Sequence, residues 1–176
     1  MRAVFFDRDG VLNEAIVRDG LPYSPGTPDQ LKVVADAPAA LAQLRAAGFL
    51  LIVVTNQPEV SRGKVTRAQV DEMNAALAAA LPLDGFMVCW HDDQDACRCR
   101  KPKPGLLEEA ARQFGIELHR SFLVGDRWRD VDAGAAAGCR TVLIDYHYLE
   151  RPPAREPDLR TTSLTEAARW ILENAE

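Results

Sequence analysis

Short apolar runs alternate with alanine-rich stretches along this chain, and this alternation limits the folds that it can adopt. Val, Ile, Leu and Phe gather in five runs, at residues 3–6, 50–54, 86–88, 122–124 and 141–144. Helical stretches separate the runs, so the pattern indicates strands that alternate with helices. Repeated βα units form a parallel sheet. The sequence therefore predicts an α/β fold.

Five helices are expected around these strands. Apolar residues at helical spacing end at Gly48, Gly115 and Gly138, and glycine is common just after a helix. Thr66 and Ser163 are each followed three residues later by Gln or Glu, which is the spacing of a capping box that opens a helix. The expected helices cover residues 37–47, 66–80, 106–114, 131–137 and a segment that begins after Ser163.

Two longer segments interrupt the alternation. Residues 14–30 are rich in glycine and proline, and residues 89–105 hold three of the four cysteines. Long irregular loops in a compact domain are usually functional. We therefore expect a flap at about 14–30 and a functional loop at 89–105, whereas the proline-rich stretch 152–157 is expected to be a plain connection.

Length and charge limit the partners. A chain of 176 residues with 47% hydrophobic content suits one core, so residues 1–176 are expected to form a single domain. Its 21 Lys and Arg against 26 Asp and Glu give a net charge of -5, which offers no general attraction to nucleic acid or to anionic membranes. No signal pattern and no membrane-spanning apolar stretch is seen. We expect a cytoplasmic monomer that binds neither nucleic acid nor membranes.

Carboxylates follow two of the expected strands, at the edge of the sheet where ligands bind in open α/β folds. Asp7 and Asp9 come directly after residues 3–6, and Asp126 comes shortly after residues 122–124. Nearby carboxylates can hold a hard cation, which lets one of them approach a phosphate. The other can act as acid and base. Taken alone, Asp7 and Asp9 also fit an Asp-Gly turn.

Neutral and cationic groups complete this edge. Thr55 and Asn56 end the second strand and can donate to a phosphate oxygen, although a turn cap is an alternative. Arg100 and Lys101 precede a helix and can neutralise phosphate charge, and a solvated basic loop is the alternative. Asp130 fits either a metal ligand or the first turn of a helix.

Together these elements resemble the four motifs of the haloacid-dehalogenase superfamily, in the same order and over nearly the whole chain. The first is Phe5-Phe6-Asp7-Arg8-Asp9-Gly10-Val11, which resembles the DxDG nucleophile loop, and the last is Gly125-Asp126-Arg127-Trp128-Arg129-Asp130. The resemblance implies a three-layer α/β sandwich around a central parallel sheet. The spans between the motifs leave no room for a separate cap domain.

The resemblance also implies roles for individual residues. Asp7 is the expected nucleophile, which forms an aspartyl-phosphate, and Asp9 is the expected general acid and then base. Thr55 and Lys101 are expected to steady the transferring phosphoryl group. Mg²⁺ is expected on the Asp7 carboxylate, the Asp9 backbone carbonyl and Asp126. The expected substrate-binding residues are Asn56, Gln57, Arg100 and Arg127.

The cysteine loop indicates a second metal site. Its candidate ligands, within eleven residues, are Cys89, His91, Cys97 and Cys99. A disulfide framework would be spread more widely. Three thiolates and one imidazole supply a closed tetrahedral Zn²⁺ site of structural type, which would hold the loop that carries Arg100 and Lys101. Free surface cysteines and redox chemistry are the alternatives, and Cys139 is expected to be a small buried residue.

This loop, together with Arg62-Gly63-Lys64, resembles the branch that contains heptose-bisphosphate phosphatases and histidinol-phosphate phosphatase domains. The branch implies hydrolysis of a small phosphorylated metabolite. A sugar phosphate such as D-glycero-D-manno-heptose 1,7-bisphosphate is the first expectation and histidinol phosphate the second. A catalytically inactive, zinc-stabilised binding module is an alternative of another class. The chain departs from the heptose enzymes at Pro58-Glu59-Val60-Ser61, which replaces a small Ser-Gly-Ile-Ala segment.

Overall fold

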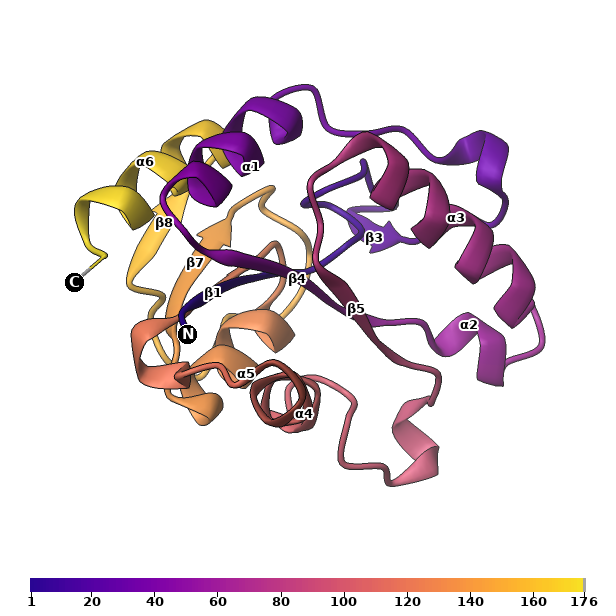
Figure 1. The fold of residues 1–176 in the computed structure, drawn as a ribbon. Coiled ribbons are helices and arrows are strands. Elements are labelled where there is room, and N and C mark those ends of the chain that lie inside the picture. Colours follow the sequence, from indigo (N-terminus) through magenta and orange to yellow (C-terminus); the bar gives the residue numbers. More distant parts are fainter. Residues whose placement is uncertain (176) are drawn as a thin grey trace.

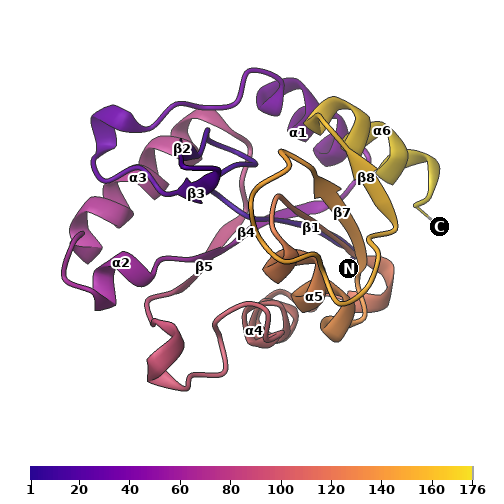
Figure 2. The ribbon, with the colours of Figure 1, turned by 180° about the vertical axis from the view of Figure 1, so that it is seen from behind.

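The computed structural model describes residues 1–175 and contains a six-stranded sheet with the order β5-β4-β1-β6-β7-β8 (Figures 1 and 2). Every neighbouring pair in this sheet is parallel. The strands are β1 (Ala3–Phe6), β4 (Leu50–Asn56), β5 (Gly85–Cys89), β6 (Phe122–Gly125), β7 (Arg140–Ile144) and β8 (Leu159–Thr161).

Helices cover both faces of the sheet because side chains alternate along each buried strand. Val4 and Phe6 of β1 belong to one apolar cluster, and Ala3 and Phe5 belong to another on the opposite face. The first cluster includes residues of α1 (Ala37–Ala46), α3 (Arg67–Ala80) and α6 (Leu164–Glu173), and the second includes residues of α4 (Gly105–Phe114) and α5 (Trp128–Ala137). Figure 1 shows the two layers. The expected three-layer α/β sandwich is confirmed.

Three small elements differ from the expectation. β8 follows the proline-rich connection but has only three residues, Leu-Arg-Thr, and so shows no apolar run. α2 (Pro58–Ser61) is one turn long, and α5 begins at Trp128, ahead of the expected start at residue 131. The short helices η1 (Pro28–Gln30), η2 (Asp93–Asp95) and η3 (Leu118–Arg120) lie in connections.

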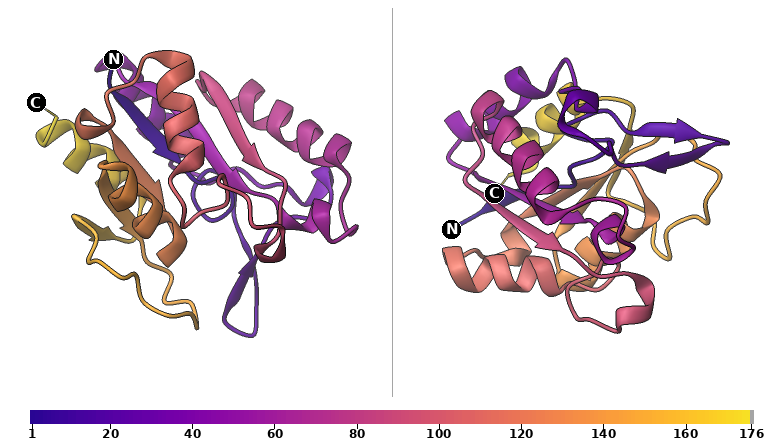
Figure 3. Two further views of the ribbon diagram at one scale, coloured as in Figure 1. Left: turned by 90° about the horizontal axis from the view of Figure 1, so that it is seen from below. Right: turned by 90° about the vertical axis from the view of Figure 1, so that its right-hand side faces the viewer.

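The expected flap contains a hairpin of β2 (Ile16–Arg18) and β3 (Leu21–Tyr23) that projects from the body of the molecule (Figure 3). Asp19 and Gly20 join the strands, and both have positive φ, 51° and 76°. Asp-Gly is a strong signal for such a two-residue turn. The sequence prediction of an irregular segment was therefore wrong for these residues, although the signal was present.

Within residues 1–175, no helix combines the length and the apolar character that crossing a membrane requires.

Candidate active site

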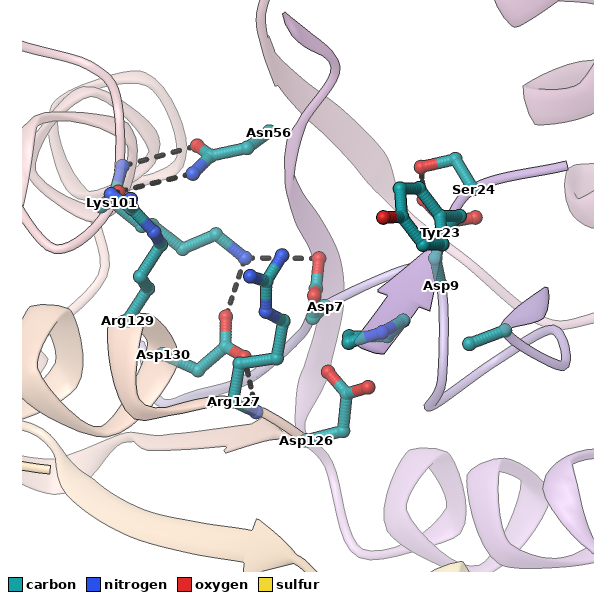
Figure 4. A pocket seen from close by; sticks show the side chains of 12 residues that line it. Asp7, Asp9, Tyr23, Ser24, Asn56, Lys101, Asp126, Arg127, Arg129 and Asp130 are labelled. Atoms are coloured by element: carbon teal, nitrogen blue, oxygen red, sulfur yellow. Dashed lines mark hydrogen bonds and ion pairs between the residues drawn. The ribbon is translucent and has the colours of Figure 1, made fainter. Parts of the chain in front are cut away.

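The carboxyl ends of neighbouring strands bring the expected catalytic side chains to one edge of the sheet (Figure 4). Asp7 follows β1, and its backbone N–H donates to the Val124 carbonyl on β6 at 3.0 Å. Asp126 follows β6. The pocket at this edge is lined by Asp7, Asp9, Ala15, Pro22, Tyr23, Ser24, Asn56, Lys101, Asp126, Arg127, Arg129 and Asp130.

Lys101 lies at the centre of this edge and is 2% exposed. Its ammonium group contacts Asp7 Oδ1 at 2.9 Å and Asp130 Oδ1 at 2.6 Å, and it donates to the Val54 carbonyl at 2.7 Å. Burial opposes the charged form, but the attraction of Asp130 and Asp7 outweighs it and raises the pKa of Lys101. Lys101 is therefore a cation that is held between Asp7 of the first motif and Asp130 of the last motif.

Asn56 holds the backbone of that lysine. Its side-chain amide donates to the Lys101 carbonyl at 3.1 Å and accepts from the Lys101 N–H at 3.0 Å. A side chain that bonds to both the N–H and the carbonyl of one residue fixes the loop against the end of β4. The structure thus places Asn56 in the pocket lining but with its amide turned to the loop.

Three carboxylates, those of Asp7, Asp126 and Asp130, bring their oxygens within 4.8 Å of one another. Burial, with the negative charges of Asp7 and Asp130, raises the pKa of Asp126 well above its usual value. Burial also raises the pKa of Asp7 to about 6, although Lys101 opposes this. Asp126 Oδ1 is buried and has no hydrogen-bond partner in the described chain. This donor set, which is all oxygen and carries excess negative charge, fits a hard dication such as Mg²⁺.

Gly10 makes room for this cluster. It has a positive φ of 87°, and a Cβ atom at this position would lie 1.9 Å from Asp126 Oδ2. Only a residue without a side chain fits between the nucleophile loop and Asp126. The glycine of the DxDG pattern is thus required by the packing of this site.

Asp130 caps a helix, which is one of the two functions between which the sequence left a choice, and it lies beside Asp7 and Asp126. Its Oδ1 accepts from Lys101, and its Oδ2 accepts from the Arg127 N–H at the start of α5 at 3.0 Å. It therefore caps a helix and also belongs to the acidic cluster.

Asp9 has a different environment from Asp7, although the two lie two residues apart. Its carboxylate accepts from Arg8, Asn13, Ser24 and Gln57 at 2.8 to 3.3 Å. Burial alone would raise the pKa of Asp9, but Arg8 and these donors outweigh burial and lower it. The free protein therefore holds Asp9 as a carboxylate, which is the form of a general base.

Arg8 is a functional residue that the sequence analysis missed. It is fully buried, and besides Asp9 its guanidinium contacts the side chain of Asn74 on α3 at 3.1 Å. A charged residue between two catalytic aspartates was the available signal. Two expected residues, Thr55 and Gln57, are also buried, and Gln57 donates to both Thr55 and Asp9.

The expected substrate-binding arginines have carboxylate partners. Arg100 donates to Asp93 at 2.8 Å, and Arg127 forms an ion pair with Glu150. Arg129, which the sequence analysis did not select, lines the pocket and reaches Asp93 at 3.3 Å. Tyr23 and Ser24 of the flap line the pocket as well and were also missed, because the sequence does not show where the hairpin packs.

The four expected ligands of the cysteine loop lie together. Their ligand atoms are all within 4.8 Å, and Cys89 Sγ lies 3.7 Å from both Cys97 Sγ and His91 Nδ1. For sulfur ligands about 2.3 Å from a tetrahedral zinc ion, neighbouring sulfurs are about 3.8 Å apart. The cysteines are free thiols. The cluster of Cys89, His91, Cys97 and Cys99 therefore has ligand chemistry that suits a metal ion.

An ion pair and a hydrogen bond join this loop to the end of α2. Arg62 contacts both oxygens of Asp92 at 2.7 Å, and Ser61 donates to Asp95 at 2.9 Å. The Pro58–Ser61 segment, at which the chain departs from the heptose enzymes, thus contacts the cysteine loop directly.

The family model for haloacid dehalogenase-like hydrolases matches residues 23–138. The chain belongs to this family. It is a phosphatase of the haloacid dehalogenase-like type, and the resemblance described above is confirmed.

Several relatives of this phosphatase are heptose-bisphosphate phosphatases. A D-glycero-beta-D-manno-heptose-1,7-bisphosphate 7-phosphatase from Pasteurella multocida is 37% identical over 155 residues, which cover 81% of each chain. Its counterpart from Helicobacter pylori is 30% identical over 97% of each chain. The crystal structure of a D,D-heptose 1,7-bisphosphate phosphatase from B. bronchiseptica, complexed with magnesium and phosphate, matches with a TM-score of 0.84 and 30% identity. The match covers 99% of this chain and 100% of the chain in that crystal structure.

The metal-free phosphatase should lose stability as the pH rises through the raised pKa values of its acidic cluster. A carboxyl whose pKa is higher when folded stabilises the fold below its unfolded pKa, and this contribution is lost as the pH rises through the folded pKa. For Asp7 that window runs from 3.8 to about 6, and the raised pKa of Asp126 acts in the same direction. Mg²⁺ competes with protons for the same oxygens, so it should raise the melting temperature more at about pH 8 than at about pH 5.

Thermal unfolding in chelator and in Mg²⁺ at both pH values measures this effect. Asp126→Asn should abolish the Mg²⁺ response and flatten the pH dependence in chelator. Asp132→Asn, which changes an acid on α5 that pairs with Arg151, should keep the response. Equal Mg²⁺ stabilisation at the two pH values would contradict the assignment.

Proposed function

We propose that this phosphatase is a magnesium-dependent phosphomonoesterase that works through an aspartyl-phosphate on Asp7. Its proposed substrate is a phosphorylated sugar, with the 7-phosphate of D-glycero-D-manno-heptose 1,7-bisphosphate as first choice, because the relatives carry that name. The observation that supports the chemistry best is the buried Lys101–Asp7 pair beside the acidic cluster, in which Asp126 Oδ1 has no hydrogen-bond partner in the described chain.

In the proposed reaction, a carboxylate oxygen of Asp7 attacks phosphorus, and the bond from phosphorus to the sugar oxygen breaks. Asp9 gives its proton to the departing sugar oxygen. Water then attacks the phosphorus of the aspartyl-phosphate and loses a proton to Asp9. The bond from phosphorus to the Asp7 oxygen breaks, so phosphate is released and the Asp7 carboxylate is restored. Thr55 and Lys101 steady the phosphoryl group, Thr55 with its hydroxyl and Lys101 with its charge.

The proposed Mg²⁺ ligands are the Asp7 carboxylate, the Asp9 backbone carbonyl and Asp126. A bound Mg²⁺ offsets the negative charge between Asp7 and a phosphate. Asp130 is assigned to Lys101 and the α5 cap, because both of its oxygens already accept hydrogen bonds from these groups.

Asp9 must be protonated before it can act as an acid, and in the free protein its donors favour the ionised form. A bound phosphate brings negative charge close to Asp9 and would raise the pKa of this carboxyl. We infer that substrate binding itself converts Asp9 from its base form to its acid form.

Asn56, Gln57, Arg100 and Arg127 are proposed to form the substrate-binding group. Arg100 and Arg127 each contact a carboxylate that a substrate phosphate could replace, since guanidinium binds phosphate in the same forked geometry. Asn56 contributes by holding the Lys101 backbone, and Gln57 contributes by holding the Asp9 carboxylate.

The cysteine cluster is proposed to hold one structural Zn²⁺. Four protein ligands leave no open position for water, so the ion would not take part in the reaction. Its proposed effect is to fix the loop at 89–105 and with it Arg100 and Lys101. We further propose that the chain works in the cytoplasm, where thiols stay reduced, as one domain and as a monomer that binds neither nucleic acid nor membrane.

A substrate panel tests the proposed function. Phosphate release should be faster from D-glycero-D-manno-heptose 1,7-bisphosphate than from histidinol phosphate, and it should require Mg²⁺. Faster release from histidinol phosphate would favour the alternative activity. No release from any phosphate ester, including p-nitrophenyl phosphate, would favour an inactive zinc-stabilised module.

Asp7→Asn and Asp9→Asn should have different effects on turnover. Asp7→Asn should abolish it with every substrate, because an amide does not form the aspartyl-phosphate. Asp9→Asn should lower turnover of a sugar phosphate by about 10²- to 10⁴-fold, because proton transfer is lost. It should lower turnover of p-nitrophenyl phosphate less, since nitrophenolate leaves without a proton. Steady-state rates on the two substrates measure the difference, and equal losses for Asp9→Asn would argue against its role as acid.

The purified protein should carry one zinc per chain, and Cys97→Ser should lose it. The variant should melt at a lower temperature and turn over more slowly, because the loop that carries Lys101 loses its anchor. Cys139→Ala, which changes a buried cysteine outside the cluster, should keep its zinc. Elemental analysis and thermal unfolding provide the measurements, and a preparation free of zinc despite no exposure to chelator would exclude this site.

A further inference from the structure

Tyr148 lies outside the motifs found in the sequence, yet it contacts a catalytic carboxylate. Its hydroxyl donates to Asp126 Oδ2 at 2.9 Å. The other oxygen, Oδ1, is buried and has no hydrogen-bond partner among residues 1–175. One oxygen of Asp126 is thus held by a side chain, and the other is left for a ligand.

The segment that carries Tyr148, residues 145–150 between β7 and β8, is braced at several points. Figure 3 shows it beside the flap hairpin. The contacts that hold it are an ion pair between Asp145 and Arg160 at 2.7 Å, an ion pair between Glu150 and Arg127, and a hydrogen bond from the Leu149 N–H to the Gly20 carbonyl at 2.9 Å. A donor on a braced segment can restrain the group that it contacts.

The ring of Tyr148 has its own support. Tyr146 stacks on it with ring centroids 5.5 Å apart and an interplanar angle of 28°. At the same oxygen, the missing side chain of Gly10 leaves the space that Oδ2 occupies. The position of Oδ2 is therefore set by two neighbours, Gly10 and the Tyr148 hydroxyl.

We propose that Tyr148 is a positioning residue for the catalytic metal: its hydroxyl fixes the rotation of the Asp126 carboxylate so that Oδ1 faces the cation position beside Asp7. The proposal rests on the proposed Mg²⁺-dependent function. Groups that orient a metal ligand through a hydrogen bond commonly change metal affinity by about 10- to 100-fold when removed. Tyr148 touches neither substrate nor metal in this scheme and acts only through Asp126.

Tyr148→Phe tests the hydroxyl alone, because phenylalanine keeps the ring and its stack on Tyr146. The probe is Mg²⁺ by itself, titrated into the full chain and followed by calorimetry and by the rise in melting temperature. We expect Mg²⁺ to bind Tyr148→Phe about tenfold more weakly than the unchanged protein. The melting temperature in chelator should stay close to that of the unchanged protein, and phosphate release should recover at high Mg²⁺. Tyr146→Phe, which removes the neighbouring hydroxyl, is the matched control and should bind Mg²⁺ normally.

The outcomes separate this proposal from the proposed function. Mg²⁺ binding by Tyr148→Phe that equals that of the unchanged protein would overturn the positioning role and leave the phosphatase proposal intact. A lower melting temperature in chelator with unchanged Mg²⁺ affinity would show a purely structural hydroxyl and would also overturn it. Failure of the unchanged protein to bind Mg²⁺ would overturn both proposals.

Discussion

The contact of the Lys101 ammonium with Asp7 and Asp130 is the interaction on which the active-site edge depends. Three buried carboxylates within 4.8 Å would repel one another strongly, and a buried charge without a partner is costly. One ammonium against three carboxylates leaves two negative charges, the number that one Mg²⁺ ion neutralises. The cluster is thus an incomplete charge balance in the protein alone, and burial, together with the neighbouring carboxylates, raises the pKa values of Asp7 and Asp126.

A cation at the centre of a sheet edge must be delivered by a loop, because the strand ends supply only the acids. Asn56 fixes the peptide of Lys101 from β4, and the cluster of Cys89, His91, Cys97 and Cys99 begins at the end of β5. In the proposed scheme, a Zn²⁺ ion in the cysteine loop would serve the same end as the buried ion pair, since both would determine where the Lys101 ammonium group lies. This connection would explain how a metal that does not contact the phosphoryl group affects catalysis.

Much of this arrangement could be predicted from the sequence, because its signals are local. The main strands are apolar runs, and the catalytic acids directly follow them. The cysteine cluster has ligand spacing within a single loop. What could not be predicted depends on contacts between distant segments: Arg8 with Asn74, Arg129 with Asp93, and Tyr148 with Asp126. The three-residue β8 was missed because parallel pairing with β7, rather than its composition, makes it a strand.

Charges in this site differ in how firmly they are held, and burial decides the difference. Lys101 and its two carboxylate partners are almost inaccessible, so their pairing resists exchange. Asp93, the partner of Arg100 and Arg129, is 57% exposed, and exposed ion pairs contribute little to stability. Under the proposed function, a substrate phosphate would replace Asp93 at small cost, whereas it would only add to the inner cluster. The inner charges would then fix the chemistry, and the exposed pairs of Asp93 would leave Arg100 and Arg129 available to different phosphorylated substrates.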